Sequence, residues 1–295
     1  MAQTDKLPIW KAVKTSWSFA AVAWMPALPA YIFRALMTGF MLSAVSVSGE
    51  SFQILKTLGV FLLLFAEIVC LSLTLRLAVR GEYEGFFGIQ VSGDEGRLLI
   101  AELLYIILIW FVVLISVFVA FNFASVFVST TIADPQSIQD DEAALLKAIT
   151  DAFQTPMGVL IALVLAFAAA IPVLYMMARL VTFSAATIGR KKIMIFETWS
   201  WTKGHAFQIM IAIVVAMLPF FVIYQLGGFM ISSALGLGFN FLLADPEEVA
   251  NVSKTQTFIY GAAISMLSMP INLVFSGLSA FMYNGFKPAD EGASR

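Results

Sequence analysis

Long apolar stretches alternate with short polar ones along the chain, and this alternation predicts its fold. Six of the apolar stretches are long enough for a helix to cross a hydrocarbon core of about 30 Å, which takes roughly 20 residues. The predicted spans are residues 17–45, 54–79, 98–125, 157–183, 206–232 and 256–283. The stretches 98–133 and 205–243 exceed one crossing, which indicates tilted or projecting helices; two crossings within 205–243 are the alternative.

The composition agrees with a protein that lies in lipid. Of the 295 residues 60% are hydrophobic and 12% are charged, about half the charged share of a soluble globular protein. We therefore predict one all-α transmembrane domain over residues 1–295, an integral membrane protein with about six transmembrane helices and amphipathic in-plane elbow helices. Residues 1–16 are predicted to be an amphipathic segment on the membrane surface, and residues 285–295 a cytoplasmic tail.

The Lys and Arg residues at the ends of the spans are unevenly distributed. Thirteen lie on the side that holds both termini, and three, Lys56, Lys147 and Lys254, lie on the other. The positive-inside rule then places the N- and C-termini in the cytoplasm and loops 131–156 and 244–255 outside. The net charge of −2 includes no basic block of the kind that follows a phosphate backbone, so nucleic acid is not an expected partner.

Pairs of loops resemble one another in sequence. Both outer loops contain Ala-Asp-Pro, at 133–135 and 244–246, where Asp is suited to cap a helix and Pro to follow it. The loops 85–99 and 194–208 each carry aromatic residues and then a polar turn with Gly. These matches indicate either a duplicated helical hairpin or chance similarity.

Arg34 and Glu67 are the only two charges predicted near the middle of the bilayer. Arg34 precedes the loop between the first two spans by about as many residues as Glu67 follows it, so an antiparallel hairpin places them at equal depth. A lone charge there costs from about 3 to more than 10 kcal/mol depending on the method, which favours an ion pair. The pair either fixes the register of the two helices or belongs to a path for a proton, an ion or a lipid headgroup.

Aromatic and basic residues are concentrated in the two cytoplasmic loops and form a predicted cytoplasmic elbow that binds lipid headgroups or anchors the helices. Its residues are Phe86, Phe87, Arg190, Lys191, Lys192, Trp199, Trp201, Lys203 and Gly204. The run Thr198 to Gly204, TWSWTKG, resembles the Ser/Thr-Trp-x-x-Thr-Lys/Arg-Gly signature of bacterial polytopic membrane proteins. These are similar to the membrane domain fused to glycerophosphoryl diester phosphodiesterases. The resemblance implies about six helices with cytoplasmic elbows in a bacterial inner membrane.

The chemistry of an enzyme or a cofactor site is not visible in the sequence. His205 and Cys70 are the only residues of their types, and HExxH, the P-loop and GxSxG are missing. We therefore expect a non-enzymatic protein without cofactors, an accessory or scaffold protein that binds membrane lipids, an envelope protein or a second copy of itself. The alternative is a carrier of a small or lipid-like substrate that uses Arg34 and Glu67.

Overall fold

A computed structural model describes residues 7–45, 53–83, 85–86, 92–131, 147, 150–237 and 252–288. Of these residues 88% are helical and none forms a strand, which confirms the all-α prediction. Phe87, both Ala-Asp-Pro sequences and the chain ends 1–6 and 289–295 lie outside the described residues.

The described ranges include six helical segments long and apolar enough to cross a membrane. They are α1 (Ile9–Val45), α2 (Gln53–Arg80), α3 (Gly93–Thr131), α5 (Pro156–Leu180), α8 (Ala206–Ala234), and α10 (Lys254–Leu267) followed directly by α11 (Met269–Phe286). Two short helices, α6 (Phe183–Arg190) and α7 (Phe196–Trp201), lie between α5 and α8. The chain is thus a multi-pass integral membrane protein, as its apolar pattern predicts.

Local sequence explains where several helices begin and end. The start of α1 differs from the prediction. Residues 9–16 do not form a separate surface helix but are the first turns of α1, because neither Gly nor Pro interrupts the chain between Ile9 and Met25. Ser253 begins α10 as an N-cap in a reciprocal capping box with Gln256. Gly236, with a positive φ of 69°, follows the end of α8, a conformation that costs glycine little.

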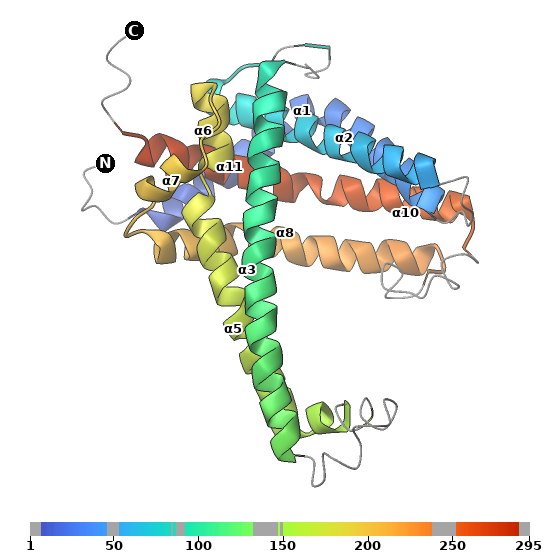
Figure 1. The fold of residues 1–295 in the computed structure, drawn as a ribbon. Helices are drawn as coiled ribbons and strands as arrows, with labels where there is room; N and C mark the ends of the chain where they lie inside the picture. The colour runs from blue at the N-terminus through green and yellow to red at the C-terminus, as the bar shows by residue number, and fades with distance from the viewer. Residues whose placement is uncertain are drawn as a thin grey trace. The chain divides into compact units, whose positions relative to one another are not determined.

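The chain divides into two compact units, of which the larger comprises Met1–Glu102 and Arg179–Arg295. In this core unit α1 is central and packs against α2, α8, α10 and α11, while α6 packs against α2 and α11 (Figure 1). Leu75, Leu98, Ile188 and Tyr283 form a buried apolar cluster where α2, α3, α6 and α11 meet. Every functional side chain considered below, except those of one apolar cavity, lies in this unit.

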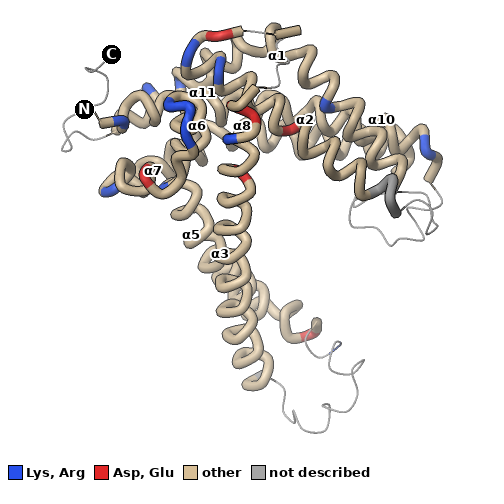
Figure 2. Tube along the Cα trace, turned by 45° about the horizontal axis from the view of Figure 1, so that its top comes forward, with Lys and Arg blue, Asp and Glu red and all other residues tan. Residues whose placement is uncertain are grey.

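The smaller unit, Leu103–Ala178, contains most of α3 and α5 as an antiparallel helical hairpin. The two helices run side by side (Figure 2), and within this unit their sequences contain no Asp, Glu, Lys or Arg from Leu103 to Thr131 or from Pro156 to Ala178. Only 6% of the apolar window in each of these spans is buried, against 28–44% in the other four. Both helices are almost wholly apolar within this unit, as expected of helices whose solvent is lipid.

Close approach of α1 and α10 depends on two glycines. A Cβ atom on Gly39 would lie 2.6 Å from the carbonyl oxygen of Phe258, and one on Gly261 would lie 3.1 Å from the Cα of Gly39. In lipid, helix association rests on such tight packing of small residues because apolar burial contributes little.

We expect Gly39→Ala to destabilise the protein by about 1–3 kcal/mol, because the added methyl group forces the two backbones apart. Gly96→Ala is the matched control, since a Cβ there meets no atom within 4 Å. The measurement is the thermal unfolding midpoint of each purified variant in mild detergent. Equal midpoints for the two variants would contradict the role assigned to Gly39.

Candidate functional site

The structure brings Arg34 and Glu67 together. Arg34 Nε of α1 contacts Glu67 Oε2 of α2 as an ion pair. Arg34 Nη2 also donates a hydrogen bond of 3.0 Å to the hydroxyl oxygen of Ser268, and the guanidinium carbon lies 5.5 Å from the centre of the Tyr31 ring. Three helical segments, α1, α2 and the α10–α11 junction, thus meet at one arginine.

Ser268 reaches Arg34 because the last transmembrane segment is interrupted at this residue. Helix α10 ends at Leu267 and α11 begins at Met269, with Pro270 in its first turn. Proline has no backbone N–H and its ring crowds the preceding turn, so the helical hydrogen-bond ladder cannot continue unchanged there. The Ser268 hydroxyl donates to the carbonyl oxygen of Ser265 at 2.7 Å, which leaves its oxygen oriented to accept from Arg34.

A pocket of about 420 Å³ lies beside the ion pair; we term it the Arg34 groove. It is lined by Arg34, Thr38, Val60, Leu63, Leu64, Glu67, Tyr224, Ile264, Ser265 and Ser268, from α1, α2, α8 and the α10–α11 segment. The two partners of the ion pair differ in exposure: the side chain of Arg34 is 12% exposed and that of Glu67 is 42% exposed. The carboxylate therefore opens into the groove, whereas the guanidinium is largely enclosed.

Two donors in the groove have no acceptor among the described residues. Arg34 Nη1 and the hydroxyl of Ser265 are buried and make no hydrogen bond there. A buried donor without an acceptor costs about 1–3 kcal/mol, and more when it is charged. The groove is therefore suited to a ligand that brings oxygen atoms to these donors.

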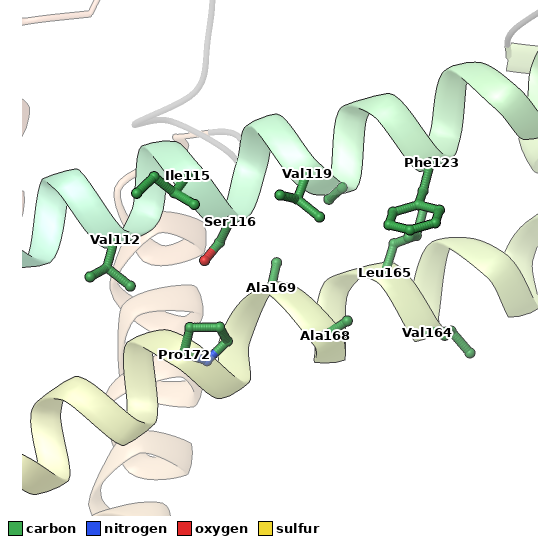
Figure 3. Close-up of a pocket in the computed structure, with 11 residues that line it drawn as sticks. Val112, Ile115, Ser116, Val119, Phe123, Val164, Leu165, Ala168, Ala169 and Pro172 are labelled. Carbon is green, nitrogen blue, oxygen red and sulfur yellow. The ribbon is translucent and has the colours of Figure 1, made fainter.

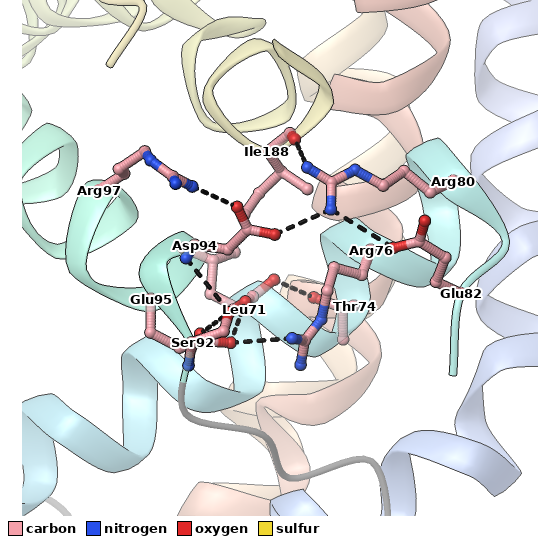
Figure 4. Close-up of polar contacts among 11 residues, drawn as sticks. Leu71, Thr74, Arg76, Arg80, Glu82, Ser92, Asp94, Glu95, Arg97 and Ile188 are labelled. Carbon is pink, nitrogen blue, oxygen red and sulfur yellow. Dashed lines mark hydrogen bonds and ion pairs between the residues drawn. The ribbon is translucent and has the colours of Figure 1, made fainter. Parts of the chain in front are cut away.

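A second polar site, which we term the α2–α3 network, lies at the C-terminal end of α2 (Figure 4). Arg76 and Glu95 form an ion pair of 3.1 Å in which the side chains are only 3% and 5% exposed. Glu95 also accepts hydrogen bonds from the Ser72 hydroxyl at 2.7 Å and from the Ser92 backbone N–H at 2.6 Å. The network therefore neutralises Arg76 in the protein interior and fixes the start of α3 against α2.

Arg80 extends this network to α6. Its Nη1 lies 2.8 Å from Asp94 Oδ2, and its Nη2 donates to the carbonyl oxygen of Ile188. Arg97 contacts the other oxygen of Asp94 at 2.6 Å. The sequence carried one signal for this site, Ser92 followed by Glu95 at capping-box spacing, but no local pattern indicated that Arg76 is buried.

The two tryptophans predicted in the cytoplasmic elbow take part in packing. Arg179 lies over the Trp199 ring at 4.6 Å and donates to the Trp199 carbonyl oxygen at 2.7 Å. Arg190 lies over the Trp201 ring at 4.6 Å, and this ring packs against Tyr283. The signature run thus ties α7 to α5, α6 and α11, which favours the anchoring interpretation of these residues.

The remaining elbow residues do not form one site. Phe86 is strongly exposed, and Lys192 makes a solvent-exposed contact of 3.7 Å with Glu197. Lys191 ends α6 in the left-handed region, with φ 53°, and lines a polar pocket of the α2–α3 network. Lys203 is exposed, and Gly204 follows it with φ 85°, a turn conformation that favours glycine.

The hairpin unit has an apolar cavity of its own, of about 470 Å³, between α3 and α5 (Figure 3). Its walls are aliphatic and aromatic side chains together with Ser116 of α3 and Pro172 of α5. Such a lining suits hydrocarbon, and none of the described residues around it is a charged group that could orient a polar ligand.

The core unit thus contains two polar sites of different character. In the α2–α3 network acidic and basic groups face one another at short distances, as a structural latch requires. In the Arg34 groove the Glu67 side chain is 42% exposed, and two buried donors have no acceptor within the described part of the chain. No family model, curated protein or solved structure matches this chain.

Proposed function

We propose that the chain is a non-enzymatic accessory protein of the membrane that binds a lipid-like ligand in the Arg34 groove. The observation that carries this proposal is the exposure of Glu67, 42% of its side chain, near the middle of an apolar helix. A charge facing hydrocarbon costs from about 3 to more than 10 kcal/mol, depending on the method. A polar group of a ligand in the groove would remove that cost, whereas a dry ion pair with only a packing role would bury both partners.

The proposed location is the bacterial cytoplasmic membrane, with both termini in the cytoplasm. The distribution of Lys and Arg between the two ends of the spans supports this orientation. The resemblance of Thr198–Gly204 to a signature of bacterial membrane proteins supports the compartment. Membrane lipids are the proposed partners of the groove. An envelope protein or a second copy of this chain would bind to the apolar surface of the hairpin unit, Leu103–Ala178.

The test is native mass spectrometry of the protein extracted from its membrane in mild detergent. We expect the wild type to carry one amphipathic ligand per chain. The double variant Arg34→Met/Glu67→Met, which keeps the side-chain volumes similar but removes both charges, should lose that ligand by about tenfold or more in occupancy.

The matched control removes an ion pair that lies outside the groove. Lys192→Met/Glu197→Met deletes an exposed contact between the turn that follows α6 and the first turn of α7, and it should retain the ligand at wild-type occupancy. Wild-type protein without a ligand, or equal occupancy in both double variants, would refute the proposal.

A carrier is the second candidate, and it is favoured by prolines in three of the segments around the groove, of which α1 contains Pro26 and Pro29. Pro219 lies within α8, and Pro270 interrupts the last segment beside Ser268. Broken helices around a polar site near mid-membrane are typical of carriers. If the wild type but not the Arg34→Met/Glu67→Met variant moves the bound ligand between the leaflets of a vesicle, the carrier interpretation is the correct one.

A further inference from the structure

The chemical character of the ligand can be deduced from the groove, provided that the groove binds a ligand as proposed above. The polar groups of the groove on which the argument rests are of two kinds, donors and a carboxylate. Donors without acceptors, Arg34 Nη1 and the Ser265 hydroxyl, require oxygen atoms, and Ser265 is only 4% exposed. The Glu67 carboxylate requires a donor, because an ionised carboxylate offers about four acceptor sites and Arg34 Nε contacts only one of its oxygens.

The net charge of the groove indicates the net charge of the ligand. Among the residues that the structure describes, Arg34 and Glu67 are the only charged side chains that line the groove, and together they are neutral. An anionic ligand would leave one excess negative charge within the membrane, and a cationic ligand one excess positive charge. A ligand that carries one charge of each sign leaves none, which the low dielectric of the surroundings strongly favours.

The walls of the groove indicate what is attached to that polar group. Val60, Leu63, Leu64 and Ile264 line it beside the polar residues. Val60 is itself well exposed on α2, one helical turn before Leu64. An acyl chain therefore has an apolar surface to follow from the polar end of the groove.

We infer that the Arg34 groove binds the zwitterionic headgroup of a phospholipid with a primary ammonium group. The phosphate oxygens accept hydrogen bonds from Arg34 and Ser265. The ammonium group donates to the carboxylate of Glu67, and the acyl chains lie along Val60, Leu63, Leu64 and Ile264. Glu67 thus determines specificity, because it is the residue that distinguishes an ammonium group from a neutral substituent on the same phosphate.

The test compares two lipids that differ only beyond the phosphate. Delipidated protein is incubated with dioleoylphosphatidylethanolamine or dioleoylphosphatidylglycerol, and the bound fraction is measured by native mass spectrometry. The wild type should prefer the ethanolamine lipid by about tenfold. Glu67→Gln should reverse this preference by a similar factor, because Arg34 is then uncompensated and an anionic lipid restores neutrality.

Two further variants complete the test, one as a matched control for Glu67→Gln and one to locate the phosphate. Glu197→Gln, a change of the same kind at an exposed position of α7, should leave the preference of the wild type unchanged. Ser265→Ala removes one donor to the phosphate and should weaken both lipids by about fivefold without altering their ratio. If Glu67→Gln does not accumulate, Ser265→Ala still decides whether the phosphate lies at this end of the groove, since unchanged binding would overturn that placement.

The other outcomes separate failure of this inference from failure of the proposed function. A wild-type preference for the glycerol lipid, or a Glu67→Gln variant that still prefers the ethanolamine lipid, overturns the zwitterion assignment while lipid binding stands. Equal binding of glycerophosphoethanolamine, which lacks acyl chains, overturns the assignment to a lipid and identifies a soluble zwitterion. No binding of either lipid refutes the proposed function itself.

Discussion

Arg34→Ala is expected to reduce the amount of folded protein in the membrane by about tenfold or more, the largest effect among single changes in the groove. The substitution removes the partner of Glu67 and the donor to Ser268 in one step. An uncompensated carboxylate then remains near mid-membrane, and it must either protonate or disturb the packing of α1 against α2. The measurement is quantitative immunodetection of the protein in isolated membranes.

The double variant Arg34→Met/Glu67→Met is the control for this loss. Replacing both partners of an ion pair in a medium of low dielectric with apolar residues of similar volume is often neutral or stabilising, so the abundance of the double variant should return to that of the wild type. If abundance returns but ligand occupancy does not, the pair serves binding as well as helix register. A single variant as abundant as the wild type would contradict any structural role of the pair.

Arg76→Met is expected to destabilise the protein by about 3–5 kcal/mol, the cost typical of breaking a buried ion pair from one side. Glu95, 5% exposed, would lose its ion pair with Arg76 and keep hydrogen bonds from Ser72 and Ser92. The α2–α3 network would then no longer hold the start of α3. The measurement is the thermal unfolding midpoint in mild detergent, together with protease sensitivity around residue 92.

Arg97→Met is the matched control, because it is the same substitution within the same network. Arg97 contacts Asp94, but its side chain is 35% exposed, so its loss should cost no more than about 1 kcal/mol. The double variant Arg76→Met/Glu95→Gln should regain much of the stability lost in Arg76→Met. Equal midpoints for Arg76→Met and Arg97→Met would show that burial of the Arg76–Glu95 pair has no energetic consequence.

The apolar pattern by itself determined the class of protein and the number of spans. The predicted span 54–79 corresponds to α2, and the span 206–232 to α8, within a few residues at each end. This agreement has a physical cause: lipid offers no hydrogen-bond partner to the backbone, so an apolar run of this length has little alternative to a helix. The contact between Arg34 and Glu67 was predictable from the same pattern, because two consecutive antiparallel spans bring residues equally far from their connection to the same level.

The tertiary structure alone decided which polar residues share a site. Ser265, Ser268 and Tyr224 line the groove with Arg34, although up to about 230 residues of chain separate them and no local pattern marks their orientation. Burial of Arg76 was equally invisible, since an arginine at a helix end is more often exposed along its length. Periodicity and hydropathy report how a residue relates to its neighbours in the chain and to the solvent. Which helices pack together, and how closely, depends on contacts between distant segments, such as that between Gly39 and Gly261, and these determine the chemistry of the Arg34 groove.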